Sequence, residues 1–167
     1  MMRLLLLSLA LLAPLACAET LTGRVVGIAD GDTITVLDTS NQQHRIRLNG
    51  IDAPEKKQPF GSRAKQNLSS LAFGKDARVE WSKLDRYGRI VGKVIVDGQD
   101  VGLQQVQAGL AWWYRQYARE QSPQDQVNYA RAEEAARLAR LGLWSDAQSI
   151  PPWEYRHKDG LRAGYRQ

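Results

Sequence analysis

The sequence has 167 residues, one cysteine, two histidines and a net charge of +5, and these counts already restrict its function. The lack of a His/Cys cluster argues against a zinc or thiol enzyme. A modest basic excess suits a polyanionic partner, although exported proteins are often basic without binding nucleic acid.

Residues 1–18 have the composition of a secretory signal peptide. Arg3 precedes an apolar stretch over residues 4–12, and Ala-Cys-Ala at 16–18 fits an A-x-A cleavage site. The stretch is shorter than the roughly 20 apolar residues that span a bilayer, so we expect no stable membrane insertion. We expect an exported protein, periplasmic or secreted. Acylation of Cys17, giving a lipoprotein, is the alternative.

Residues 19–146 are long enough to form one domain, and the chain there begins with strands. Ranges 21–29 and 33–38 are rich in β-branched residues and flank a Asp-Gly-Asp turn. Range 44–51 alternates apolar and basic residues. Three strands with short turns predict an antiparallel meander.

The next segments alternate between helix and strand patterns. Apolar residues at helical spacing predict a helix over 62–73, and two further strands are predicted at 77–83 and 89–98. Asp100 is a candidate cap for a short helix.

A third helix is the most clearly marked element. Ser122 fits its N-cap and Pro123 its first position, and the Ala-rich pattern runs to Leu141 with Gly142 as the stop. Residues 147–167 form a basic tail without periodicity, which we expect to be flexible.

Five strands, with a helix after the third, suit a small closed OB-type β-barrel. With three helices, the predicted fold class is α+β.

Acidic residues occur in two turns of the meander, at Asp32 and Asp52. Adjacent strands lie about 4.8 Å apart, so turns at one barrel end can converge and two carboxylates can share a hard cation such as Ca²⁺. Taken singly, the Asp-Gly-Asp turn is better explained by solvated acids that stabilise a tight turn, and the segment at Asp52 is equally explained as a strand end before Pro54.

Two arginines lie close to these turns in the sequence. Arg47 is on the strand that leads to Asp52, and Arg89 opens a later strand. Arginine matches phosphate by bidentate hydrogen bonds, although surface salt bridges such as Arg47 with Glu55 are an alternative. Carboxylates, arginines and a hard metal fit phosphoryl transfer to water.

Five motifs occur in an order and at spacings that resemble the staphylococcal nuclease family. They are DGDT (30–33), RLNGIDAPE (47–55), DRYGR (85–89), AGLAW (108–112) and GLW (142–144). The resemblance covers residues 22–144 and implies a Ca²⁺-dependent nuclease on an OB barrel with three helices.

The resemblance also implies the roles of nine residues. The metal would be held by Asp32, Asp52 and the backbone carbonyl of Ala53. The catalytic residues would be Arg47, Glu55 and Arg89. Substrate would contact Arg86, Tyr87 and Tyr117. Tyr114 and Arg115 depart from the pattern of the best-known member of the family.

The expected reaction is hydrolysis of DNA and RNA phosphodiesters with little sequence specificity, leaving 3′-phosphate products. Single-stranded or breathing nucleic acid is the expected substrate; no protein partner is implied, and we expect a monomer. The alternatives are a non-catalytic OB-fold nucleic-acid-binding module and a structural protein of the envelope. Degenerate relatives typically lose the catalytic acids and arginines, whereas all five such positions are kept here.

Overall fold

The structure is a computed structural model, and it describes residues 19–157. The predicted signal peptide, with Cys17, lies outside the described residues, as does the end of the predicted tail. The limits predicted for the signal peptide, the domain and the tail therefore stay predictions.

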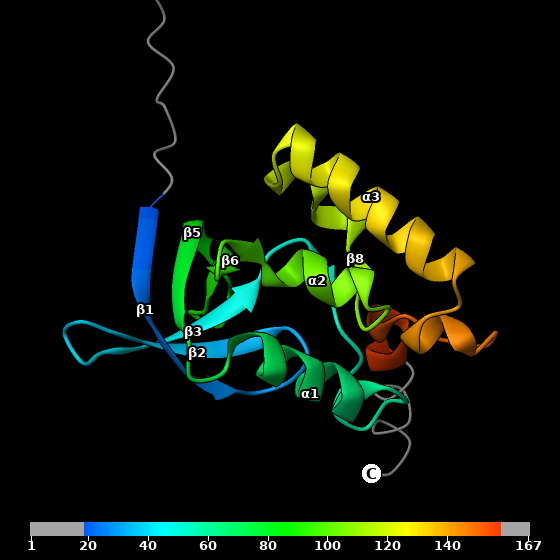
Figure 1. The fold of residues 1–167 in the computed structure, drawn as a ribbon, viewed down its shortest axis with the longest axis horizontal. Helices are drawn as coiled ribbons and strands as arrows, with labels where there is room; N and C mark the ends of the chain where they lie inside the picture. Colours follow the sequence, from blue (N-terminus) through cyan, green and yellow to red (C-terminus); the bar gives the residue numbers. More distant parts are fainter. Residues whose placement is uncertain (1–18, 158–167) are drawn as a thin grey trace, which may run out of the picture.

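A closed five-stranded barrel forms one side of the molecule, and the helices form the other (Figure 1). Its strands are β1 (Glu19–Ile28), β2 (Thr33–Asp38), β3 (Gln43–Leu48), β5 (Asp76–Leu84) and β6 (Ile90–Val96). They pair in the order β3-β2-β1-β5-β6, and a parallel pairing of β3 with β6 closes the barrel. β7 (Gln99–Asp100) extends β6. The predicted α+β barrel fold is confirmed.

The barrel interior follows from the alternation that the sequence shows. Every second residue of β6 is buried, and Ile34, Val36 and Ile46 of the neighbouring strands are fully buried. Successive strand residues point to opposite faces, so this alternation sends one set of aliphatic side chains into the core.

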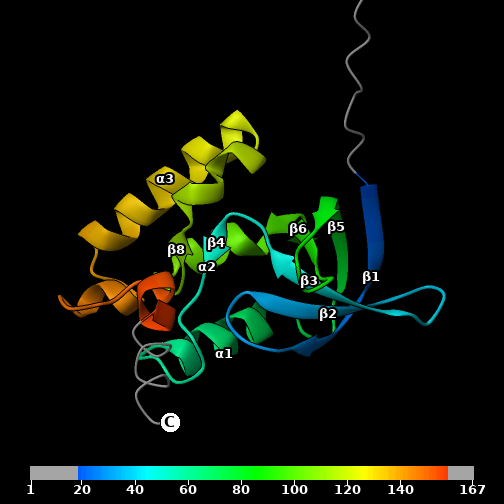
Figure 2. The same ribbon diagram turned by 180° about the vertical axis from the view of Figure 1, so that it is seen from behind.

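The prediction of one continuous strand over 44–51 is wrong after residue 48. β3 ends at Leu48, and Gly50 takes a positive φ of 75°, a conformation that glycine adopts without steric cost. The chain then forms a separate short strand, β4 (Ile51–Asp52), which pairs with β8 (Trp112–Trp113). Figure 2 shows β4 and β8 beside each other, away from the barrel strands.

Three α-helices cover the barrel, as the sequence predicted: α1 (Gly61–Ala72), α2 (Val101–Gln107) and α3 (Pro123–Leu138). α1 and α2 pack against each other, and α3 packs on the outside of α2. The side chain of Asp100 caps α2 and that of Ser122 caps α3, which confirms both predicted caps.

α3 ends at Leu138, three residues before the predicted end. Arg140 adopts a positive φ of 52° there, which breaks the helix before the predicted stop at Gly142. Two 3₁₀ segments, η1 (Arg115–Glu120) and η2 (Gly142–Ser145), flank α3. No helix within residues 19–157 is long and apolar enough to cross a membrane.

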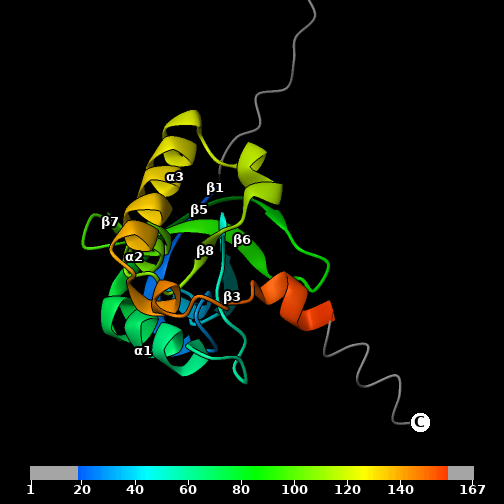
Figure 3. The same ribbon diagram turned by 90° about the vertical axis from the view of Figure 1, so that its right-hand side faces the viewer.

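Residues 152–157 are helical, although the sequence of the tail shows no periodicity. This turn, red in Figures 1 and 2, lies beside β8. The tail thus returns to the part of the molecule where β4 and β8 pair. Figure 3 shows the same turn from the side.

Candidate active site

A cleft opens at one end of the barrel, between the loop before β2, the β3–β4 turn, the β5–β6 turn and the segment after β8. Its volume of about 640 Å³ is in the range of sites that hold a small ligand. All nine residues predicted from the resemblance line this one cleft: Asp32, Arg47, Asp52, Ala53, Glu55, Arg86, Tyr87, Arg89 and Tyr117.

The loop before β2 is fixed by hydrogen bonds from distant parts of the chain. The carbonyl of Asp32 accepts a hydrogen bond from the amide of Leu48, and its Oδ2 accepts one from the amide of Ala53 at 2.8 Å. The buried Gln105 of α2 donates to the carbonyl of Gly31 at 2.6 Å. Asp32 and Ala53, which are 21 residues apart in the sequence, are therefore in direct contact in the fold.

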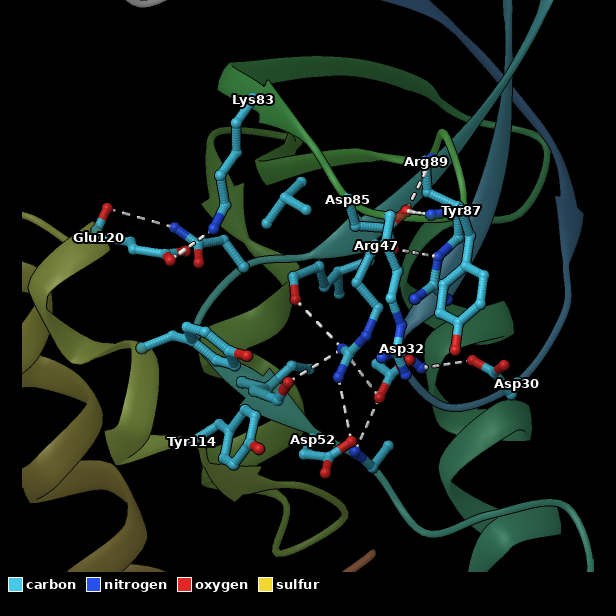
Figure 4. A pocket seen from close by; sticks show the side chains of 18 of the residues that line it. Asp30, Asp32, Arg47, Asp52, Lys83, Asp85, Tyr87, Arg89, Tyr114 and Glu120 are labelled. Carbon is cyan, nitrogen blue, oxygen red and sulfur yellow. Dashed lines mark hydrogen bonds and ion pairs between the residues drawn. The ribbon is translucent and has the colours of Figure 1, made fainter. Parts of the chain in front are cut away.

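Arg47 joins the two carboxylates that were predicted to share a cation. Its Nη1 lies 3.0 Å from Oδ2 of Asp32, and its Nη2 lies 3.0 Å from Oδ1 of Asp52 (Figure 4). Nη1 also donates to the carbonyl of Ile51 at 2.9 Å. The alternative ion pair of Arg47 with Glu55 is not formed within the described residues.

Burial sets the electrostatics of the acids in this cleft. Burial raises the pKa of Asp52, although Arg156 and Arg47 pull it down. Burial and the adjacent Asp32 carboxylate raise the pKa of Asp30 to about 6. Both effects mean that the folded chain holds negative charge here at a cost, which a bound cation would relieve.

Glu55 follows β4 and lies at the rim of the cleft. Its amide donates to Oε1 of Gln58, and its carbonyl accepts from the amide of Gln58, so a tight turn holds its backbone. Its Oε1 accepts a hydrogen bond from Nη1 of Arg156 at 2.7 Å. Its side chain is 40% exposed, so it can meet water.

Arg89 is held by Asp85, four residues earlier. The Nε of Arg89 donates to Oδ2 of Asp85 at 2.7 Å, and the amides of Tyr87 and Arg89 both donate to Oδ1. Nη1 of Arg89 also reaches Oγ1 of Thr33 at 3.4 Å. The β5–β6 turn thus fixes the direction of this guanidinium (Figure 4).

Aromatic side chains form the walls of the cleft. The exposed ring of Tyr87 lies 4.8 Å from the guanidinium carbon of Arg86 and 5.6 Å from that of Arg89. Tyr117 packs edge-to-face on Tyr114, with ring centroids 5.1 Å apart. These rings and cations together suit a stacked base beside a phosphate.

The donor set of the cleft fits a hard divalent cation. Asp32 is 7% exposed and Asp52 is 1% exposed. Ala53, which follows Asp52 in the sequence, is also buried. These positions offer only oxygen ligands, which Ca²⁺ prefers. Within residues 19–157 no group of three or more His, Cys, Asp or Glu side chains converges to hold a metal ion.

The sequence analysis did not assign several residues in and around the cleft, among them Asp30, Asp85, Gln105 and Arg156. Asp30 and Asp85 lie inside motifs that were recognised, and Asp85 stands four residues before Arg89, a spacing that could have revealed it. Gln105 and Arg156 carry no local signal, because each acts on segments that are far away in the sequence.

Comparisons with known proteins agree with this geometry. Residues 45–146 match the family model described as "Staphylococcal nuclease homologue". The chain is 45% identical over 146 residues to an "Uncharacterized endonuclease" of Escherichia coli, covering 87% of this chain and 90% of that protein. It is 46% identical over 143 residues to a "Micrococcal nuclease" of Shigella flexneri, covering 80% and 79%.

A plant protein is also similar over the central part of the chain. It is the "Staphylococcal-like nuclease CAN1" of Arabidopsis thaliana, 38% identical over 115 residues, which cover 69% of this chain and 34% of the plant protein. The similarity therefore extends to longer proteins of eukaryotes.

Proposed function

The chain belongs to the staphylococcal nuclease family and is a phosphodiester hydrolase, and we propose that it is a Ca²⁺-dependent nuclease for DNA and RNA. The observation that carries the proposal is the convergence of Asp32, Asp52 and Glu55 with Arg47 and Arg89 around one cleft.

The two carboxylates and the Ala53 carbonyl would hold the ion. Bound Ca²⁺ would neutralise charge on the phosphate and polarise one of its oxygens. The burial of Asp32 and Asp52 and their convergence on Arg47 support this assignment, because the fold brings two buried negative groups to one position that already attracts a positive charge.

Glu55 orients the attacking water and accepts its proton. Its partial exposure and its place at the rim of the cleft support this role, since a general base must be within hydrogen-bond reach of the water. The turn formed with Gln58 keeps the Glu55 backbone in place during the reaction.

The two arginines act on the phosphate at different stages of the reaction. Arg47 holds it in ground and transition states. Arg89, directed by Asp85, stabilises the charge that grows at the phosphorus and the leaving 5′-oxygen. Cleavage on that side leaves 3′-phosphate products.

Sequence preference should be weak. The residues of the cleft grip phosphate or stack on bases, and neither contact reads base edges. Single strands, and duplexes that open transiently, fit the cleft more easily than a stable duplex.

The test is digestion of heat-denatured DNA and of RNA by the purified protein with Ca²⁺, and again with a chelator. We expect cutting only with Ca²⁺, and 3′-phosphate ends on end-labelled substrate. Binding without cutting would contradict the proposal and favour the non-catalytic OB module. Cutting that a chelator does not abolish would contradict the metal dependence.

We also propose that the enzyme is exported, on the basis of the composition of residues 1–18. Fractionation of the producing cells and mass measurement of the mature chain test this. A mature chain that begins after Ala18 and is free of membranes is expected. A lipidated Cys17 would replace this proposal by a membrane-anchored form.

A further inference from the structure

The segment before the end of the described chain docks on the cleft by aromatic contacts. Trp153 stacks on Tyr114, with ring centroids 5.1 Å apart and planes 19° from parallel. Trp153 and Trp112 of β8 also form an edge-to-face pair, with ring centroids 6.4 Å apart. Pro152, beside it, is buried. Such stacked and edge-to-face pairs stabilise a short helical turn that could not hold its position alone.

This docking brings Arg156 to the two acids at the centre of the site. Nη2 of Arg156 donates to Oδ2 of Asp52 at 2.8 Å, and Nη1 donates to Oδ1 of Asp52 at 3.2 Å and to Oε1 of Glu55 at 2.7 Å. One guanidinium thus cross-links two carboxylates that are three residues apart. Arginine can do this because its planar donors diverge in a fixed fork.

The contact matters most for Glu55. Among residues 19–157, the Glu55 carboxylate has no hydrogen bond other than the one from Arg156. Only Oε1 is used, so Oε2 keeps its lone pairs for a water. The turn at Gln58 fixes the backbone of Glu55 but leaves its side-chain torsions free.

We propose that Arg156 is a positioning residue of the nuclease site, which fixes the Glu55 carboxylate relative to Asp52. This inference rests on the proposed function. The C-terminal segment 151–157 then belongs to the catalytic unit and is not an appendage to it. Arg156 also offsets the mutual repulsion of two carboxylates, which would otherwise turn Glu55 away from Asp52.

The kinetic test compares Arg156→Gln and Arg156→Lys with the unchanged enzyme on single-stranded DNA with Ca²⁺. Because a misplacement of about 1 Å can cost about 100-fold in rate, we expect Arg156→Gln to lower kcat about 10- to 100-fold with little change in KM. Arg156→Lys should recover part of kcat, since an ammonium keeps the charge but not the fork.

Two matched controls separate position from charge. Arg131→Gln removes one exposed positive charge on α3, and Glu154→Gln changes an exposed residue on the same turn as Arg156. Neither should alter kcat. A loss of kcat in Arg131→Gln equal to that in Arg156→Gln would overturn the inference, because net charge would then explain both.

A measurement independent of turnover checks that the segment stays docked. Amide hydrogen exchange of residues 153–157, with and without Ca²⁺, should show protection that Ca²⁺ does not reduce. Release of the segment on Ca²⁺ binding, or a kcat of Arg156→Gln at or above that of the unchanged enzyme, would overturn the inference and make the segment an internal competitor of the ion. If the unchanged enzyme does not cut at all, the proposed function fails, whereas the exchange result still decides the docking.

Discussion

Gly61, the first residue of α1, lies against the backbone of Glu55: a Cβ on residue 61 would stand 2.1 Å from the Glu55 carbonyl oxygen. The start of the helix and the candidate general base therefore share one tightly packed contact. Only a residue without a side chain allows the turn after Pro54 to close on α1 in this way.

Gly61→Ala should therefore displace Glu55. The new methyl group forces the turn away from α1, and over-packing of this kind costs about 1–3 kcal/mol of stability. We expect a lower kcat and a lower midpoint in urea. Ser62→Ala, at the exposed next position, is the control and should change neither. A Gly61→Ala enzyme with unchanged kcat would show that the contact does not position Glu55.

Arg89→Ala should abolish most turnover while leaving the fold intact. The side chain is partly exposed and bonds mainly to Asp85 on its own turn, so its loss leaves no buried cavity. A transition-state arginine is worth about 10³–10⁵ in rate in other phosphoryl transfers. Single-turnover cleavage of single-stranded DNA and thermal melting measure the two effects. Near-normal activity would remove Arg89 from the mechanism.

Gln105→Leu should destabilise the protein and loosen the loop that carries Asp32. The Gln105 amide is fully buried and donates to the carbonyls of Gly31 and Ala64 at 2.6 and 2.9 Å. The Gly31 carbonyl loses this donor, and a buried carbonyl left without a donor costs about 1–3 kcal/mol. Urea unfolding measures the loss, with the exposed Gln107→Leu as control. Equal unfolding midpoints for the two variants would contradict this reading.

Calcium should stabilise the folded protein. An ion that binds only the folded state adds about 2.7 kcal/mol to the free energy of unfolding at 100 times its Kd. Thermal melting with Ca²⁺ and with a chelator should therefore differ by several degrees, and Asp52→Asn should remove the difference. A Ca²⁺-dependent shift that persists in Asp52→Asn would place the ion elsewhere.

Asp100, which lies outside the cleft, should make the stability of the protein depend on pH. Burial raises the pKa of Asp100, although it caps α2 and accepts a hydrogen bond from Tyr129. An acid whose folded pKa is raised contributes stability that is fully present below its unfolded pKa, about 3.9, and lost as pH rises through the folded pKa.

Asp100→Asn keeps an acceptor for the helix cap but cannot ionise. Its stability relative to the unchanged protein should therefore increase as the pH rises above the unfolded pKa of about 3.9, measured by urea unfolding. A difference that stays constant as the pH rises would show that the pKa of Asp100 is the same in the folded and unfolded states.

The motifs and the barrel strands could be predicted from the sequence because each depends on a pattern of neighbouring residues. Alternation places the core residues of β6, Asp-Gly-Asp marks a turn, and Ser122 with Pro123 marks a helix start. Each such pattern fixes the backbone of a few neighbouring residues. The family resemblance then predicted nine site residues, and all nine line one cleft in the structure.

The sequence by itself thus determined the five barrel strands, the three α-helices and their order, and through the family resemblance it predicted roles for Asp32, Asp52, Glu55, Arg47 and Arg89. Only the tertiary structure decided that β4 pairs with β8, that Gln105 ties the acidic loop to α1, and that Arg156 reaches Glu55 over 101 positions of sequence. The helical turn at 152–157 is too short to show a period, and its position depends on Trp153 packing on Tyr114. Contacts of this kind depend on how finished elements pack, which no local pattern of residues encodes.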